Sequence, residues 1–85
     1  MNYCVRIERD AYKALSTIQR NDRVKIAEAI DLLKEQPESG KLLYGKWKNL
    51  RSLRVGDYRI VYSIIETDMA ILVVRIGHRK DIYRF

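Results

Sequence analysis

The chain of 85 residues has a single cysteine, Cys4, and no long hydrophobic run. One cysteine excludes an intramolecular disulfide, and no cysteine and histidine spacing indicates a metal site, so we expect no cofactor. No run approaches the roughly 18 apolar residues that a membrane helix needs, and the N-terminus lacks the apolar region of a signal peptide. There is also no internal repeat and no glycine-rich phosphate loop. We therefore expect a cytoplasmic protein that does not enter a membrane.

The chain does contain enough apolar sequence for one small domain over residues 1–85. Hydrophobic residues make up 47% of it, which is typical of a globular domain and not of a disordered one. A chain of this length buries only roughly 60–65% of the surface that its unfolded state exposes. That leaves room for one sheet and one layer of helices.

The net charge of +6 lies entirely in the second half of the chain. Residues 1–40 carry seven basic and seven acidic side chains, whereas residues 41–85 carry ten basic and four acidic ones. An excess confined to one region favours a polyanionic partner, with RNA or DNA ahead of an acidic protein. A soluble surface that happens to be basic is the alternative.

The residue pattern predicts the elements in order. Alternation predicts a half-buried strand over residues 2–8, and helical spacing predicts a short helix to about residue 18 and an amphipathic helix ending near Gln36. After an irregular segment at 41–49, β-branched and aromatic residues predict strands at 51–55, 58–65 and 70–76. The predicted fold is α+β: two N-terminal helices on one face of a small antiparallel sheet, in the order β-α-α-β-β-β with a short C-terminal tail.

Two of these strands contain arginines where a structural strand would carry Thr, Val or Ser. In the strand at 58–65, one face is bulky and apolar and is assigned to the helices, so Arg59 points to the uncovered face. By the same alternation Arg75 shares a face with Ile71 and Val73, and we expect it on the uncovered side too.

The polar tail adds to this surface, because the four-residue spacing of Arg79 and Tyr83 places both on one side of a helical turn. Guanidinium groups bind phosphate oxygens bidentately and stabilise the extra charge of a pentacoordinate transition state, and an aromatic ring stacks on an unpaired base. With Arg59 these residues predict an RNA-binding cluster; the alternative is separate snorkelling or salt-bridged arginines. Its expected rim is Lys46, Lys48, Arg51, Arg54 and Arg75.

Two motifs carry a resemblance to a known family: LRVGDYRIVY at residues 53–62 and RIGHRKDIYR at residues 75–84. With the order of elements, they resemble the RelE-like branch of the RelE/ParE superfamily of type II toxins over essentially the whole chain. The resemblance implies a RelE-like fold and a metal-independent endoribonuclease that enters the ribosomal A site and cleaves the mRNA by attack of the ribose 2′-hydroxyl. It also implies a cognate antitoxin that wraps and neutralises the toxin in a hetero-oligomeric complex.

Position by position, the resemblance implies that Arg59 stabilises the phosphate, that Arg79 lies near the leaving 5′-oxygen and that Tyr83 stacks on or orients the base. RelE-type enzymes have lysines in the preceding strand, one of them a proposed general base. This chain has Leu50 and Ser52 there. Its nearby cations replace the charge, but arginine, with an unperturbed pKa above about 12, is a poor base.

Two side chains are candidates for the missing base. Histidine has an unperturbed pKa of about 6.5, and His78, the only histidine, is adjacent to Arg79; a role as a turn residue explains it equally well. Tyr83 is the other, because neighbouring cations favour the ionised form of a tyrosine. The missing lysines keep two other functions open: a ParE-like inhibitor of DNA gyrase without nuclease activity, and a basic nucleic-acid-binding domain without toxicity.

Overall fold

The computed structural model describes residues 2–82 of the chain. Strand β1 (Cys4–Ile7) leads into helices α1 (Arg9–Thr17) and α2 (Arg20–Leu33). Four more strands follow, with three single-turn helices between them. The strands are β2 (Lys41–Leu42), β3 (Arg51–Val55), β4 (Tyr58–Ile65) and β5 (Ala70–His78), and the short helices are η1 (Pro37–Ser39), η2 (Gly45–Trp47) and η3 (Glu66–Asp68). The predicted α+β fold is confirmed.

The five strands form one sheet in the order β1-β5-β4-β3-β2. Strands β3 to β5 pair antiparallel, as expected, and β2 pairs antiparallel with β3, but β1 pairs with β5 in parallel, so the sheet is mixed. Alternation of side chains fixes the face that a strand buries and says nothing about the direction of its partner. Strand β2 lies in the segment that we expected to be irregular, where only Lys41 and Leu42 pair with β3.

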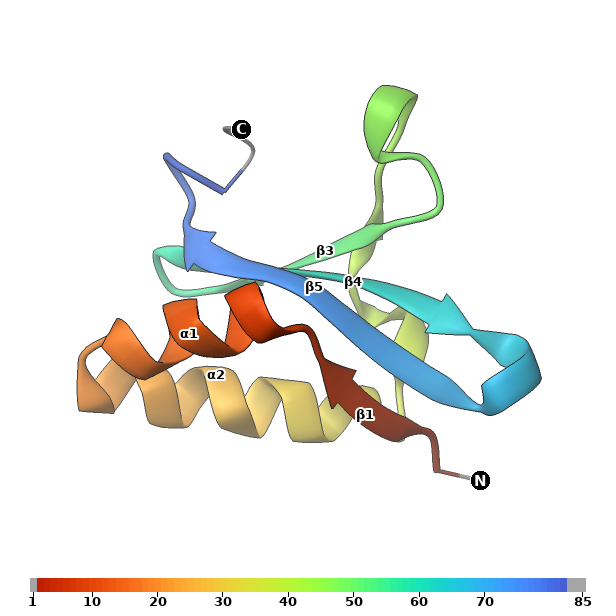
Figure 1. The fold of residues 1–85 in the computed structure, drawn as a ribbon, viewed down its shortest axis with the longest axis horizontal. Coiled ribbons are helices and arrows are strands. Elements are labelled where there is room, and N and C mark those ends of the chain that lie inside the picture. The colour runs from red at the N-terminus through yellow and green to blue at the C-terminus, as the bar shows by residue number, and fades with distance from the viewer. Residues whose placement is uncertain (1, 83–85) are drawn as a thin grey trace.

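Both helices lie on one face of the sheet, below it in Figure 1. The loop that carries η2 and the tail that follows β5 lie above the sheet, on the other side, which we call the open face. The core between the layers is apolar throughout, because each helix buries one stripe. It contains Ala11, Ile18, Ile26, Ile30 and Leu33 from the helical layer and Ile60, Tyr62, Ile71, Val73 and Ile76 from the sheet.

Helix α2 ends at Leu33, about one turn before the expected end. The last turn tightens, because the amide of Lys34 donates to the Asp31 carbonyl and that of Glu35 to the Leu32 carbonyl, each three residues back. Pro37 then begins η1. Over residues 2–82, neither helix is long and apolar enough to cross a membrane.

A β-bulge interrupts the pairing of β4 with β5. Val61 lies opposite Arg75 and Tyr62 lies opposite Val73, so Val74 is the extra residue on β5. A bulge of one residue reverses the faces of all side chains beyond it. The expectation that Arg75 shares a face with Val73 is therefore wrong: Val73 belongs to the core, and Arg75 lies on the open face with its partner Val61.

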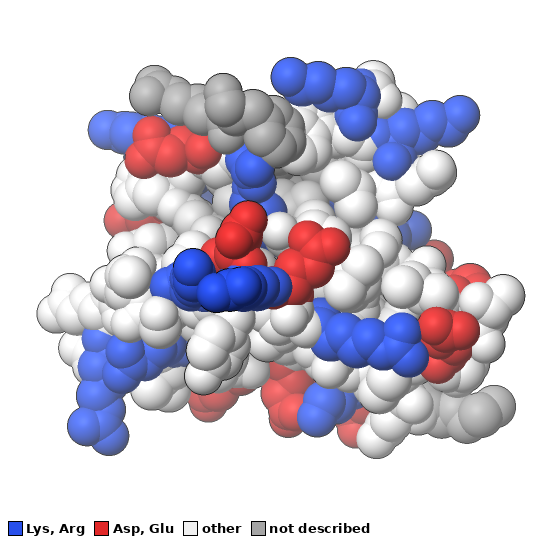
Figure 2. Space-filling view, viewed as in Figure 1, with Lys and Arg blue, Asp and Glu red and all other residues white. Residues whose placement is uncertain are grey.

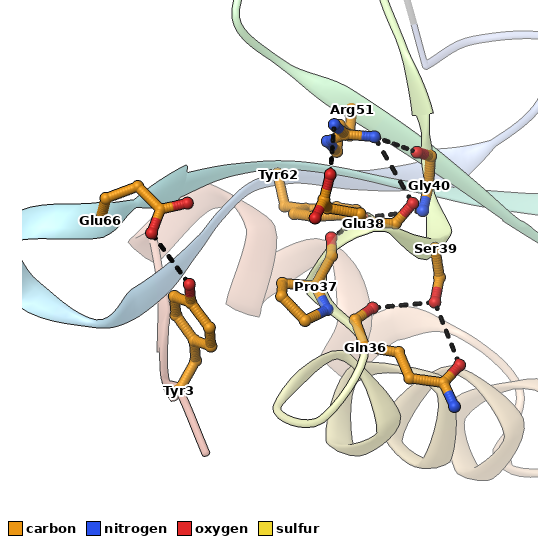
Figure 3. A network of polar contacts seen from close by, with 9 residues as sticks. All are labelled: Tyr3, Gln36, Pro37, Glu38, Ser39, Gly40, Arg51, Tyr62 and Glu66. Carbon is orange, nitrogen blue, oxygen red and sulfur yellow. Dashed lines mark hydrogen bonds and ion pairs between the residues drawn. The ribbon is translucent and has the colours of Figure 1, made fainter. Parts of the chain in front are cut away.

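Tyr62 joins the sheet to the segment after α2 (Figure 3). Its side chain is fully buried. The hydroxyl donates a hydrogen bond of 2.6 Å to the Pro37 carbonyl and accepts one of 2.8 Å from the Gly40 amide. A Cβ at Gly40 would lie 2.7 Å from the hydroxyl oxygen, so only glycine fits there.

Candidate functional site

The centre of the predicted cluster is a row of three residues, Arg54, Arg59 and Gly77, that crosses the open face. We call it the arginine row. Arg54 of β3 lies opposite Arg59 of β4, and Arg59 lies opposite Gly77 of β5. Directly opposite side chains on neighbouring strands have Cβ atoms about 4.5–5.5 Å apart. Arg54 is exposed and donates from Nε to the Gly56 carbonyl at 3.2 Å, while Arg59 is half-buried. The two guanidinium groups therefore extend from neighbouring positions on the open face.

The tail brings a third arginine to the same end of the sheet. The Arg79 amide donates to the Asp57 carbonyl at 2.8 Å, which attaches the start of the tail to the β3–β4 turn beside Arg54 and Arg59. The amides of Asp81 and Ile82 both donate to the His78 carbonyl, so the tail forms the expected helical turn. Arg79 itself is exposed. Tyr83 lies outside the described residues, so its place beside Arg79 stays a prediction.

Arg75 lies further along the same face, and its guanidinium contacts two other segments. It donates a hydrogen bond of 2.8 Å to the Ile82 carbonyl in the tail, and its Cζ lies 5.7 Å from the centre of the Trp47 ring. Lys46 places its Nζ 5.8 Å from the same ring. Lys46 and Lys48 are exposed on the η2 loop, so the loop contributes cations above the open face.

The structure does not bring Arg51 or His78 to this face. Arg51 lies opposite Tyr62 on the side of the helices, where it donates to the Gly40 carbonyl at 2.9 Å and faces Glu38 at 3.7 Å (Figure 3). His78 lies opposite Tyr58, and their rings meet edge to face at 5.7 Å. Its Nδ1 accepts a hydrogen bond from the Lys80 amide. Alternation of side chains along the strands could have predicted both positions, because Arg51 shares a face with Leu53, and His78 shares a face with Ile76.

Neither position where RelE-type enzymes carry a lysine supplies a base. Leu50 is apolar and half-buried. Ser52 is 4% exposed, and its buried hydroxyl has no hydrogen-bond partner among the described residues. A side chain so deeply buried does not reach a substrate on the surface. Neither position therefore supplies a base, and the side chains that Arg54 and Arg59 present on the open face are cations.

A groove of about 540 Å³ lies between the start of α1, the edge of β5 and the tail. Trp47 and Leu50 contribute to its apolar wall, and Glu8, Asp10 and Asp81 bring carboxylates to it. Carboxylates repel phosphate groups. In Figure 2, Lys and Arg side chains gather at the upper right of the view, over the η2 loop, and the Asp and Glu side chains in the middle lie next to a Lys or Arg side chain. A polyanion would follow the arginine row and avoid this groove.

Two tyrosines outside the site have raised pKa values. Burial raises the pKa of Tyr62, and the hydrogen bond from Gly40 and the charge of Arg51 oppose that rise. The hydrogen bond from Tyr3 to Glu66, 2.9 Å long, raises the pKa of Tyr3 (Figure 3). Both groups stabilise the fold and lie away from the arginine row. Among the described residues, no three His, Cys, Asp or Glu side chains gather as metal ligands would.

Two residues of the site were not identified from the sequence. Trp47 was placed in an irregular segment, yet its ring is the contact between the η2 loop and Arg75. Ile82 was part of a tail described as polar, yet it is only 2% exposed. Ile82 is the only aliphatic residue after Gly77 in the sequence. That was the available sign that the tail packs against the sheet.

The fold and this face define the class: a small basic protein with one mixed sheet, two helices and arginines on the uncovered side. The family described as the ParE toxin of type II toxin-antitoxin system, parDE, matches residues 5–83. The toxin RelG of Mycobacterium tuberculosis is 31% identical over 86 residues, which cover 99% of each chain. The chain belongs to the RelE/ParE superfamily and is a type II toxin of the RelE family.

Solved structures agree with this assignment. The toxin-antitoxin complex RelBE2 from Mycobacterium tuberculosis contains a chain with a TM-score of 0.85 and 27% identity; the match covers 93% of this chain and all of that one. The archaeal RelE-RelB complex from Pyrococcus horikoshii gives a TM-score of 0.77 at 28% identity, over 95% of this chain and 99% of the other. Both relatives were crystallised with a RelB antitoxin.

Proposed function

We propose that this toxin is a ribosome-dependent mRNA endonuclease that cleaves by attack of the ribose 2′-hydroxyl on the adjacent phosphate. The observation that carries the proposal is the end of the open face where Arg54 and Arg59 are direct neighbours and the Asp57–Arg79 hydrogen bond holds a third arginine beside them. Guanidinium groups stay charged at any physiological pH and form two parallel hydrogen bonds with phosphate oxygens. Such a site suits a phosphodiester whose charge increases in the transition state.

In this mechanism the residues have separate roles. Arg59, half-buried, stabilises the developing charge on the phosphate, and Arg79 stabilises the leaving 5′-oxygen. Arg54 with the η2 cations Lys46 and Lys48 holds the neighbouring phosphates. Because Leu50 is apolar, Ser52 is buried and His78 lies on the side of the helices, the ionised form of Tyr83 is proposed to accept the proton of the 2′-hydroxyl as this oxygen bonds to phosphorus and the bond to the 5′-oxygen breaks. General-base catalysis contributes about 10²–10⁴-fold, so Tyr83→Phe should lower the cleavage rate by that order without weakening RNA binding.

The test adds purified toxin to a translating mRNA and maps new 5′ ends by primer extension. Arg59→Ala and Arg79→Ala should each abolish cuts inside codons, and loss of one transition-state donor corresponds to about 10²–10³-fold in rate. Arg20→Ala is the control, because it removes one exposed charge from α2, on the other side of the sheet. Cuts that persist in both site variants would refute the catalytic role of the two arginines, and the absence of cuts with the wild-type toxin would refute the nuclease assignment.

The second candidate is a ParE-like inhibitor of DNA gyrase, which is favoured by the family match over residues 5–83 and by the missing lysines at positions 50 and 52. Here the arginine row would bind the enzyme or its DNA without chemistry of its own. Purified gyrase and supercoiled DNA decide between the two. Accumulation of cleaved DNA with the toxin, together with intact mRNA in the translation assay, would select gyrase.

A cognate antitoxin is the proposed partner in the cytoplasm, in addition to the ribosome and its mRNA. Two described surfaces fit an amphipathic helix or strand from such a partner. One is an apolar groove of about 460 Å³ between α1 and α2, lined by Tyr12, Leu15 and Val24. The other is the sheet edge at β2, where Leu42 and Tyr44 are 41% and 78% exposed. Acidic groups on the partner would meet the basic face.

A further inference from the structure

We propose that Arg75 is a positioning residue and not an RNA-binding residue. Its side chain contacts both the tail, at the Ile82 carbonyl, and the η2 loop, at the Trp47 ring, and we call these two contacts together the lock. The lock fixes where Arg79 and Lys46 stand relative to Arg59. Its effect on catalysis rests on the proposed nuclease function, whereas the lock itself is a property of the fold. The two can therefore be measured separately.

The first step of the argument is the bulge. Because Val74 is an extra residue, β5 presents Arg75 on the open face directly opposite Val61, which is fully buried. The stem of Arg75 thus starts at a covered position in the sheet. Its guanidinium lies above it, between the tail on one side and the η2 loop on the other.

On the tail side, a polar and an apolar contact act together. The guanidinium donates to the Ile82 carbonyl at 2.8 Å, and the Ile82 amide donates to the His78 carbonyl at 3.0 Å. The Ile82 Cδ1 lies 3.4 Å from the point that a Cβ on Gly77 would occupy, and the side chain is 2% exposed. Ile82 therefore packs over Gly77 at van der Waals distance, and Arg75 holds the turn in that place.

On the loop side, the contact is the Trp47 ring, 5.7 Å from the guanidinium carbon. A guanidinium over an aromatic face is stabilised by the ring quadrupole. The backbone hydrogen bonds of η2 are local: Trp47 donates to Tyr44, and Lys48 to Gly45. The contact of Arg75 with Trp47 is thus a direct connection between these local turns and β5.

Arginine suits both contacts at once. The planar guanidinium stacks on a ring through its face while its edge donates hydrogen bonds, and a lysine ammonium can supply only a point charge. Arg75→Lys therefore keeps the charge and the aliphatic stem but should loosen the lock. Arg75→Gln removes the charge as well.

Trp47 is the only tryptophan in the chain, so its fluorescence reports directly on the loop. In Arg75→Lys, acrylamide quenching of Trp47 should increase and amide exchange at Ile82 should become about tenfold faster, the factor expected for loss of one hydrogen bond to a charged group. Arg20→Lys on α2 is the control and should change neither. Unchanged quenching and exchange in Arg75→Lys would overturn the proposal. If that variant does not fold, Trp47→Leu probes the lock from the other side and should also speed exchange at Ile82.

Kinetics separate positioning from binding. A phosphate-binding arginine replaced by Gln should reduce the slope of log affinity against log salt by about 1. A positioning arginine should leave that slope unchanged and lower kcat while KM stays within about twofold. A reduced slope, or a cleavage rate unaffected by a loosened tail, would overturn the positioning role. If the wild-type toxin cuts no mRNA, the nuclease proposal fails, while fluorescence and exchange still decide whether the lock exists.

Discussion

The replacement Tyr62→Phe tests the joint between the sheet and the segment after α2. Phenylalanine keeps the buried ring and removes only the hydroxyl, which bonds to Pro37 and Gly40 at 2.6 and 2.8 Å. Leaving the buried Gly40 amide unpaired costs about 1–3 kcal/mol, and the lost bond to Pro37 costs about 0.5–1.5 kcal/mol. We expect the free energy of unfolding to fall by about 2–4 kcal/mol, a large fraction for a small domain.

The pH dependence provides a second signature of the same hydroxyl. Because burial raises the pKa of Tyr62 above its ordinary value of 10.0, the unfolded chain loses this proton first as the pH rises. The stability from the hydroxyl is therefore complete below about pH 10 and is lost above it, as pH rises toward the folded-state pKa. The difference between wild type and Tyr62→Phe should be constant from pH 7 to 9 and should narrow above about pH 10.

Urea unfolding followed by circular dichroism at several pH values measures both quantities. The matched control is Tyr12→Phe, because Tyr12 is 63% exposed and surface changes of this kind stay within about 0.5 kcal/mol. A cost of Tyr62→Phe that is no larger than that of the control would refute the reasoning. So would a difference that is the same at pH 7 and pH 10.5.

Three further outcomes are expected. Gly40→Ala should lower the free energy of unfolding by about 1–3 kcal/mol in urea unfolding, because its Cβ would overlap the Tyr62 ring. Gly45→Ala should lower it by about 1–2 kcal/mol for another reason: no atom lies within 4 Å of its Cβ, but the φ of +68° is strained for alanine. Ser52→Ala should be neutral or stabilising by up to about 1 kcal/mol in the same assay, because it removes a buried unpaired hydroxyl. Ribosome binding should weaken steeply with salt, and Arg54→Ala should lower that slope by about 1 while Arg20→Ala leaves it unchanged; equal slopes for both variants would contradict a phosphate contact at Arg54.

The sequence predicted most of the architecture because regular strands and helices have fixed periods. The face of Arg59 followed from alternation within β4, where the pairing with β3 is unbroken. The position of Arg75 on the open face was also expected, but the grouping with Val73 behind that expectation was wrong. A one-residue bulge depends on how two strands fit together, and no periodicity within one strand reports it.

The candidate site was less accessible to sequence reasoning, because charge alone does not show which arginines are engaged inside the molecule. Arg51 and Arg54 are three residues apart in one strand and lie on opposite faces, one bonded to Gly40 and the other in the arginine row. The role of Trp47 depends on its contact with Arg75, 28 residues further along the chain, and that of Ile82 on a hydrogen bond from Arg75, which comes seven residues before it. Such contacts are set by tertiary packing.

The place of β5 in the sheet bears on when the toxin becomes active during its synthesis. This strand lies between β1 and β4, yet a ribosome makes it after every other described strand. Until it emerges, β1 has no neighbour to pair with and the helices have only part of the apolar surface they cover. A nascent chain without β5 therefore pairs Arg54 with Arg59 but does not yet contain Arg79, so the three arginines come together only after β5 has been made.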